Sequence, residues 1–116
     1  EGHVLWYASD QLARPGKRSV LSPLFGEPAL TNVGITSLVE MSGASVVPYQ
    51  PVRVSKGRYL MRFLPPLENF PSGSDQEDAA TLNAIVEQHI KLAIEQYLWI
   101  RPRFKDRPAP LPNPYK

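Results

Sequence analysis

SDQEDAATLNAIVEQHIKLAIEQYLWIRPRFKDR, residues 74–107, contains the strongest fold signals in the chain. Ser74 and Glu77 match a capping box, in which two side chains satisfy free backbone amides at the start of a helix. Pro102 cannot continue a helix, because it lacks an amide hydrogen and its ring clashes with the preceding turn. The stretch therefore predicts a helix over about 75–100, followed at once by a different kind of segment.

The side chains of this expected helix divide into two faces. Its apolar positions recur at the three- and four-residue spacing of one side of a helix. The expected buried face comprises Leu82, Ile85, Val86, His89, Ile90, Ala93 and Tyr97. The expected exposed face comprises Asn83, Glu87, Lys91 and Glu95. One side of the helix is therefore expected to cover a hydrophobic core.

A cationic strip follows the helix at residues 101–107, which hold four bases and one acid. In an extended segment alternate residues share a face. That geometry would place Arg101, Arg103, Lys105 and Arg107 on one side of the strip. Four adjacent cations suit an anionic ligand, but most charge runs are solvated surface. The spacing leaves both interpretations open.

The composition fits one small globular domain. The chain has 116 residues, of which 42% are hydrophobic, and this is enough for a core. Its formal net charge of +2, from 13 basic and 11 acidic residues, does not favour nucleic acid as a partner. With no cysteine and two histidines, we expect neither a metal site nor a cofactor. No apolar run reaches the roughly 18 residues of a membrane span. The first residue is Glu, so we expect a fragment or a processed piece.

Apolar runs, prolines and glycines divide the rest of the chain. In chain order we expect a strand at 3–8, a long loop at 9–27, a helix at 28–42, strands at 45–54 and 58–64 joined by a turn, a connector at 65–73 and an extended tail at 108–116. Gly43 is placed to cap the end of the first helix. Pro48 and Pro51 remove hydrogen-bond donors, which favours an edge strand or an interrupted one.

A strand, a crossover with a helix and a second strand form a right-handed unit with parallel strands. We therefore expect an α/β fold with a mixed sheet and flanking helices. In that topology three basic groups and Asp10 meet at the carboxyl edge of the sheet, where open α/β sheets usually bind ligands. The groups are the loop with Arg14, Lys17 and Arg18, the turn with Arg53, Lys56 and Arg58, and the cationic strip. This arrangement predicts an anion site, with ordinary loop charges as the alternative.

The residues contain no recognisable catalytic group. A hydrolase or transferase needs a nucleophile or a general base beside a polarising group. Neither His3 nor His89 has a carboxylate at the short spacing that would support it. His89 also falls on the apolar helix face, which favours a hydrogen-bonded core histidine. No nucleophile elbow, glycine-rich phosphate loop or paired-histidine metal motif occurs. The residues alone therefore predict anion binding without chemistry.

Five segments occur in one order along the chain: VLWYASDQ at 4–11, SVLSPLFGEPALT at 19–31, SGASVVP at 42–48, PPLENFPS at 65–72 and EQYLWIRPRFKDRP at 95–108. Together they resemble the lipid A biosynthesis acyltransferases, the lauroyl and myristoyl transferases of Gram-negative bacteria. The resemblance implies an inner-membrane enzyme, facing the cytoplasm, that moves an acyl chain from acyl carrier protein to a phosphorylated glucosamine disaccharide. It also implies that residues 1–116 are the carboxyl-terminal part of a lysophospholipid-acyltransferase-like fold. The family's catalytic His and carboxylate would lie upstream, and the chain alone would be inactive.

The same resemblance implies a set of substrate-binding residues: Asp10, Gln11, Gly26, Arg101, Arg103, Lys105 and Arg107. Asp10 and Gln11 match the family's Asp-Gln pair near the active site, and Asp10 is also a candidate for a supporting role in catalysis. Gly26 matches the Gly before Pro-Ala. Arg103 and Lys105 match the Arg-Phe-Lys of the tail, which could hold a phosphate or sugar acid through charge-assisted hydrogen bonds. Structural ion pairing of that tail is the alternative role.

Two function classes follow. The first is the acyltransferase part, with an acyl carrier protein or another acyl thioester as donor, a phosphorylated glycolipid as acceptor, a membrane surface and no nucleic acid as partners. Leu12–Arg14 and Arg101–Arg103 depart from the family's usual residues, so a phosphatidylinositol mannoside or an ornithine lipid is an alternative acceptor. The second class is a non-catalytic α/β module that binds an anionic partner through a basic edge.

Overall fold

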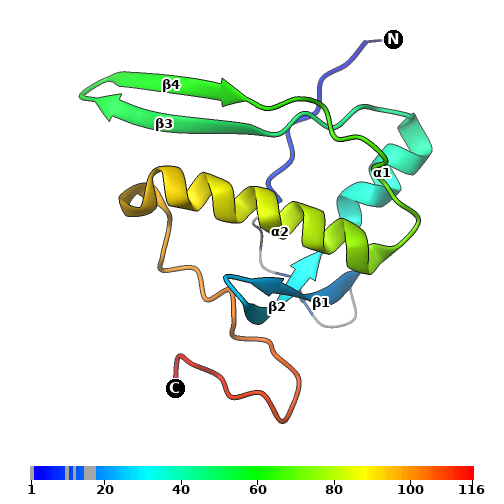
Figure 1. Ribbon diagram of the computed structural model, residues 1–116, viewed down its shortest axis with the longest axis vertical. Helices are drawn as coiled ribbons and strands as arrows, with labels where there is room; N and C mark the ends of the chain where they lie inside the picture. Colours follow the sequence, from blue (N-terminus) through cyan, green and yellow to red (C-terminus); the bar gives the residue numbers. More distant parts are fainter. Residues whose placement is uncertain (1, 10, 12, 15–17) are drawn as a thin grey trace.

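The structure is a computed structural model that describes residues 2–9, 11, 13–14 and 18–116. In chain order its elements are β1 (Ser19–Leu24), β2 (Glu27–Asn32), α1 (Gly34–Ser42), β3 (Tyr49–Ser55), β4 (Arg58–Phe63), α2 (Asp75–Leu92) and the short 3₁₀ helix η1 (Ile94–Gln96). Figure 1 shows α2 between the β1–β2 hairpin and the β3–β4 hairpin. The molecule is flat, with extents of 44 × 39 × 19 Å, so its elements form few layers.

The expected mixed sheet is wrong. In the part of the chain that the structure describes, each sheet has two antiparallel strands, β1 with β2 and β3 with β4. The expected strand at 3–8 is also wrong, because these residues pair with no other strand and Val4 is 98% exposed. Without a first strand, no parallel crossover forms. The coarser α/β class, with two helices and two small sheets, is confirmed.

The second half of the expected 9–27 loop is a hairpin, so that prediction is wrong. Phe25 and Gly26 form its two-residue turn, with φ of 52° and 78°. Positive φ at both positions matches the twist of a tight hairpin. Pro23 and Pro28 face each other across the two strands. These two prolines favoured a loop in the sequence. Both strands of the hairpin are edge strands, however, and an edge strand tolerates a missing amide hydrogen.

The first helix begins at Gly34 and not at Pro28, because Pro28 belongs to β2. The Oδ1 atom of Asn32 accepts a hydrogen bond from the amide of Gly34 at 2.7 Å. Gly43 ends the helix in the left-handed conformation and donates its amide to the carbonyl of Val39 at 2.8 Å. The cap expected from Gly43 is therefore confirmed.

The β3–β4 hairpin confirms the expected pair of strands and the turn between them. The amide of Leu64 donates to the carbonyl of Pro48 at 2.9 Å, so the pairing continues one residue past the end of β4. Gln96 closes the outer edge of β3: its side-chain Oε1 accepts from the amide of Arg53, and its Nε2 donates to the carbonyl of Arg53, both at 2.8 Å. Pro51 lies two residues before Arg53 and so also faces this outer edge, where it costs no bond within the hairpin.

The predicted start of α2 is confirmed and its predicted end is wrong. The Oγ atom of Ser74 accepts from the amide of Glu77 at 3.3 Å, which is the N-cap half of the predicted capping box. The amide of Ser74 donates to the Oγ of Ser72 at 3.2 Å, and not to the side chain of Glu77. The α-helix ends at Leu92, where Ala93 adopts φ −151° and ψ 64°. The indole of Trp99 donates back to the carbonyl of Ile94 at 2.8 Å, so the chain folds over itself after η1. Residues 97–100 therefore lie outside the helix.

One residue of the face of α2 that was predicted to be exposed lies in the core. Asn83, expected to be exposed, is 2% exposed. Its Nδ2 donates to the Oγ1 of Thr31 at 2.9 Å and to the carbonyl of Pro23 at 3.0 Å. This amide joins α2 to the β1–β2 hairpin beside an apolar cluster of Leu24, Ala29, Val86 and Ile90, on which Tyr97 and Phe104 pack. The helix therefore buries a wider surface than its apolar pattern indicates.

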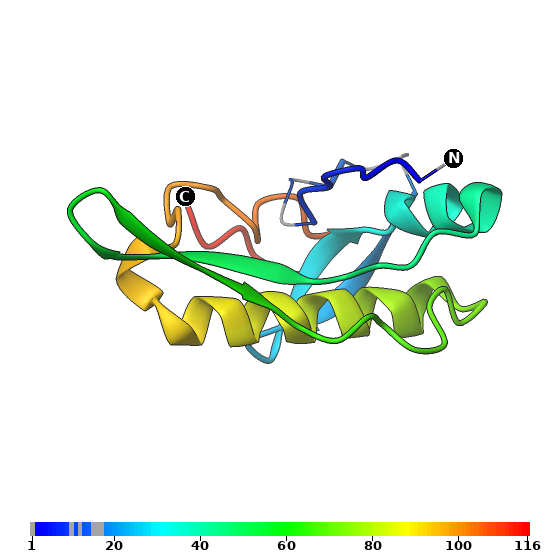
Figure 2. The same cartoon turned by 90° about the horizontal axis from the view of Figure 1, so that it is seen from above.

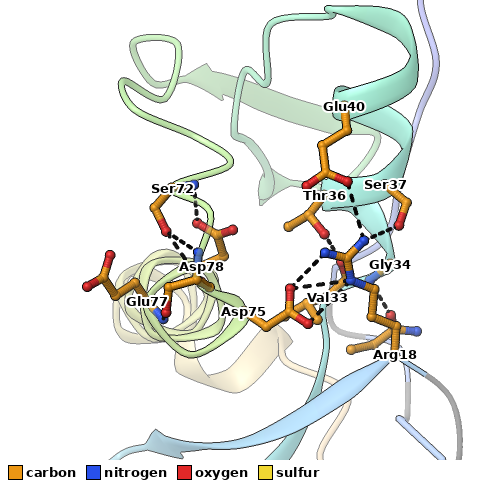
Figure 3. Close-up of polar contacts among 12 residues, drawn as sticks. Arg18, Val33, Gly34, Thr36, Ser37, Glu40, Ser72, Asp75, Glu77 and Asp78 are labelled. Carbon is orange, nitrogen blue, oxygen red and sulfur yellow. Dashed lines mark hydrogen bonds and ion pairs between the residues drawn. The ribbon is translucent and has the colours of Figure 1, made fainter.

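Arg18 ties the start of α2 to α1 (Figure 3). Its Nη2 lies 2.9 Å from Oδ1 of Asp75, and its Nη1 lies 3.5 Å from Oε2 of Glu40. Nη1 also donates to the hydroxyl of Ser37. The hydrogen bond with Asp75, followed by the charges of Asp75 and Glu40, raises the pKa of Arg18 above its ordinary value. This cation, expected to face an anionic ligand, is therefore occupied by protein carboxylates.

Candidate anion-binding site

The cationic strip is not extended, so the prediction that its four bases share one face is wrong. Turns shape it: the amide of Arg103 donates to the carbonyl of Arg101 at 2.9 Å, and that of Lys105 donates to the carbonyl of Pro102 at 3.1 Å. As a result Arg103 is 5% exposed, whereas Arg101 and Lys105 are exposed. The strip therefore has one cation beneath it and two on its outer surface.

Arg103 meets the segment that carries the Asp-Gln pair, although 92 residues separate them. Its Nη1 donates to the carbonyl of Gln11 at 3.4 Å. Its Nε and Nη2 are buried and have no hydrogen-bond partner among the described residues. A buried cation requires a compensating partner, so the guanidinium is a source of positive potential beneath this surface. Asp10 lies outside the described residues.

A hollow of about 540 Å³ lies over this contact. Its lining residues come from the two ends of the chain: Gln11, Ala13, Arg14, Arg101, Pro102, Lys105 and Asp106. Figure 2 shows the N-terminal segment and the C-terminal tail on the same side of α2. Three cations and one acid line the hollow, so its net charge is positive. Gln11, Arg101 and Lys105 were expected in the site, whereas Arg14 was expected only in a basic loop.

Arg107 and Gly26 are not among the residues that line this hollow. The Nη1 of Arg107 lies 3.2 Å from Oε2 of Glu27, which follows Gly26 in the β1–β2 turn. Its Nη2 donates to the carbonyl of Pro112 at 2.7 Å. These contacts hold the tail against β2. The substrate-binding role of Arg107 and Gly26 stays a prediction, and their contacts also provide a structural role.

The convergence of three basic groups at one edge is wrong in two of its parts. Arg18 is paired with Asp75 and Glu40. The second group, Arg53, Lys56 and Arg58, belongs to the β3–β4 hairpin, whose turn projects away from the tail in Figure 1. The reason is topological: no parallel sheet forms among the described residues, so no common carboxyl edge gathers these loops. Among the described residues of the three groups, Arg14 and the tail line one hollow; Lys17 lies outside the described residues.

A second hollow, of about 360 Å³, lies between α2 and the β3–β4 hairpin, and aromatic side chains provide much of its wall. Tyr7, Tyr49, His89 and Tyr97 are among its lining residues. Burial raises the pKa of Tyr7 and lowers the pKa of His89. His89 is partly buried and not in the core, and its Nε2 is buried without a hydrogen-bond partner among the described residues. The expectation of a hydrogen-bonded core histidine is therefore wrong in both respects.

Acidification below about pH 6.5 is expected to destabilise the chain through His89. Because burial lowers its folded-state pKa, the unfolded chain, with an ordinary pKa of about 6.5, takes up a proton first as the pH falls. The stability contributed by the neutral imidazole is fully present above about pH 6.5. It is lost as the pH falls from there toward the pKa of His89 in the folded chain. Urea unfolding at several pH values should show a shallower loss for His89→Gln. The exposed His3→Gln is the control and should behave as the unsubstituted chain; equal slopes in all three would contradict the assignment.

Residues 1–106 match the model of a protein family described as bacterial lipid A biosynthesis acyltransferase. The chain belongs to this family. The resemblance inferred from the five segments is therefore confirmed, and the matched region includes the hollow-lining residues from both ends of the chain.

Curated members of the acyltransferase family show the same similarity. The chain is 42% identical to the lipid A biosynthesis lauroyltransferase of Escherichia coli K12 over 117 residues, covering 99% of the chain and 38% of that protein. It is 38% identical to the palmitoleoyltransferase of the same organism over 112 residues, covering 94% of the chain and 36% of the relative. The chain is 33% identical to a lipid A biosynthesis acyltransferase of Haemophilus influenzae over 108 residues, covering 90% of the chain and 34% of that protein. The chain thus spans just over a third of these relatives, and no solved structure matches it.

Two features are absent from residues 2–9, 11, 13–14 and 18–116. No helix there is both long enough and apolar enough to cross a membrane. No group of three or more His, Cys, Asp or Glu side chains there is arranged to hold a metal ion.

Proposed function

We propose that this chain forms the carboxyl-terminal part of an acyltransferase that moves a fatty acyl chain to a lipid A precursor or a related phosphorylated glycolipid. Acyl carrier protein, or a similar acyl thioester, is the donor, and the enzyme works at the cytoplasmic face of the inner membrane. The His and carboxylate that perform the chemistry lie outside these 116 residues. The proposal rests on family membership and on the charge of one hollow.

The observation that carries the role of this region is the basic hollow of Arg14, Arg101 and Lys105. All three residues are exposed, and none of them forms an ion pair with a described residue, in contrast to Arg18 and Arg107. A phosphate carries between one and two negative charges at neutral pH and accepts several hydrogen bonds. Guanidinium groups bind such an oxyanion through two parallel hydrogen bonds. The hollow therefore suits the phosphate of the acceptor headgroup.

Removing the two outer cations of the tail is expected to weaken acceptor binding. In the full-length acyltransferase, Arg101→Gln with Lys105→Gln should raise KM for a phosphorylated acceptor by roughly tenfold, about 1.4 kcal/mol, since each exposed charged contact contributes at most about 1 kcal/mol. The turnover number should change less than about twofold, because binding and not chemistry is altered. Initial-rate measurements with the phosphorylated acceptor and its dephosphorylated analogue test this.

The matched control is Lys56→Gln, which removes a cation from the β3–β4 turn, outside the hollow. It should leave KM unchanged for both acceptors. Equal KM values for the two acceptors in the unsubstituted enzyme would contradict phosphate recognition by this region. A full-length protein that binds the phosphorylated glycolipid through Arg101 and Lys105 but transfers no acyl chain would instead favour the non-catalytic binding module.

A further inference from the structure

β4 has the composition of a covered strand and yet both of its faces are open. All six of its residues are exposed. On one face lie Tyr59, Met61 and Phe63, which are 65%, 47% and 67% exposed; Leu60, on the other face, is 50% exposed. Strands that carry large apolar side chains on both faces occur inside sheets covered on both sides. An isolated two-stranded hairpin in water is at best marginally stable.

The outer edge of β4 also has unpaired backbone groups. In an antiparallel pair, hydrogen-bonded residues alternate with residues whose amide and carbonyl point away from the partner strand. The amide of Leu64 donates to Pro48, and the register pairs Arg62 with Gln50 and Leu60 with Val52. Leu60 and Arg62 therefore bond to β3. The amides and carbonyls of Tyr59, Met61 and Phe63 point outward, and no described residue forms a hydrogen bond with them.

The two edges of the hairpin are treated differently. On β3, the side chain of Gln96 satisfies the outward groups of Arg53, Pro51 has no amide hydrogen to satisfy, and the register shifts between Arg53 and Ser55. Bulges, prolines and covering side chains are the usual means of protecting an exposed edge. β4 has no proline and no bulge. The chain therefore closes the edge of β3 and leaves the edge of β4 ready for pairing.

We propose that β4 is an interior strand of a larger sheet, and that its outer neighbour is a β-strand from the part of the acyltransferase outside these 116 residues. The inference rests on the proposed function, in which this chain is one part of a longer enzyme. It is supported by the lengths of the relatives: the match covers 38% of the lauroyltransferase, so most of that polypeptide is available to supply a strand. Pairing would satisfy the outward groups of β4 and place the side chains of a neighbouring strand beside its apolar ones.

Charge and backbone chemistry favour this occupant over a second copy or a lipid bilayer. Residues 49–63 carry Arg53, Lys56, Arg58 and Arg62 and no acid, so two copies joined through β4 would bring like charges together, which is destabilising. The hydrocarbon of a bilayer cannot satisfy unpaired amides and carbonyls, so an open sheet edge is excluded from it. We therefore expect the neighbouring strand to carry apolar side chains. We also expect it to carry a carboxylate on the face of the sheet where Arg58 and Arg62 lie.

Amide hydrogen exchange of the full-length enzyme in D₂O tests the proposal, with an internal control in the same strand. Leu60 and Arg62 bond to β3 in any case, so their amides report the stability of the hairpin. If a further strand pairs with β4, the amides of Tyr59, Met61 and Phe63 should be protected to within about tenfold of that level. Exchange of these three amides more than about a hundredfold faster than at Leu60 and Arg62 would overturn the proposal.

The same measurement separates the other occupants. Protection that disappears when the enzyme is diluted to a monomer would overturn the proposal in favour of a second copy. Protection that appears only with added phospholipid vesicles would overturn it in favour of a membrane surface. Acyl transfer is measured on the same samples: an active enzyme with unprotected Met61 leaves the proposed function intact and removes this inference, whereas an inactive enzyme with protected Met61 does the reverse.

A pair of variants gives an independent test. Met61→Pro removes only an outward-facing amide, directly opposite Pro51 in the register, so an unpaired edge should tolerate it as β3 tolerates its own proline. If β4 is interior, Met61→Pro should lose most of the soluble full-length enzyme, while Met61→Thr, which keeps the amide, should retain it. Equal soluble yield and equal urea midpoints for the two variants would overturn the proposal.

Discussion

Replacing Asn83 with leucine is expected to lower the free energy of unfolding by about 3 kcal/mol, although leucine is the more apolar side chain and favours helix. The amide of Asn83 is buried and donates to Thr31 and to the carbonyls of Ser22 and Pro23. Leucine would leave these acceptors buried without a donor, and each unsatisfied group costs about 1–3 kcal/mol. Since a domain of this size is stable by only about 5–15 kcal/mol, the loss should be large.

Urea unfolding followed by circular dichroism measures this effect. The matched control is Gln88→Leu, which replaces an exposed amide on the same helix. It should change the free energy of unfolding by less than about 0.5 kcal/mol. If the two leucine variants are equally stable, the hydrogen bonds from Asn83 do not hold α2 on the β1–β2 hairpin.

Asp10→Asn in the full-length acyltransferase is expected to lower kcat by about a hundredfold or more. The expectation comes from the family resemblance, which places the Asp-Gln pair near the active site, and from the usual size of general acid–base or supporting carboxylate effects. Asp10 itself lies outside the described residues. The contact between Gln11 and Arg103 shows that the next residue along the chain meets the basic tail.

Single-turnover and steady-state rates of acyl transfer measure this effect, with folding checked by the unfolding midpoint. Glu68→Gln is a suitable control, because Glu68 is an exposed carboxylate in the connector before α2. It should retain kcat to within about twofold. Unchanged kcat and KM in Asp10→Asn would remove Asp10 from the candidate catalytic and substrate-binding residues.

The candidate site could be predicted in part. Gln11, Arg101 and Lys105 were expected together and do line one hollow. Arg14 was expected at the anion site only through the basic 9–27 loop. It was not among the substrate-binding residues, because Leu12–Arg14 depart from the family's usual residues. The burial of Arg103 was missed because alternate spacing assumes an extended strip, and turns at Arg101 and Pro102 replace that spacing. The sequence showed which residues are charged, but the turns decided which of these side chains are buried and which are exposed.

The sequence by itself determined the features that depend on a few neighbouring residues. Ser74 starts α2, Gly43 ends α1, and Lys56 with Gly57 turns between β3 and β4. In each case a cap or a positive φ acts within about four residues, so local chemistry is sufficient. The proline content of 19–32 also had a local meaning, but it could describe either a loop or two edge strands.

Only the tertiary structure decided which segments meet. It paired β1 with β2, and it placed Asn83 inside and Arg103 beneath the tail. Within the described part of the chain it also left the outer edge of β4 without a partner strand. The physical reason is that burial and hydrogen-bond satisfaction depend on groups far apart in the chain. Asn83 is polar on any local scale, but it is stable in the core because acceptors on β1 and β2 lie within hydrogen-bonding distance of its amide.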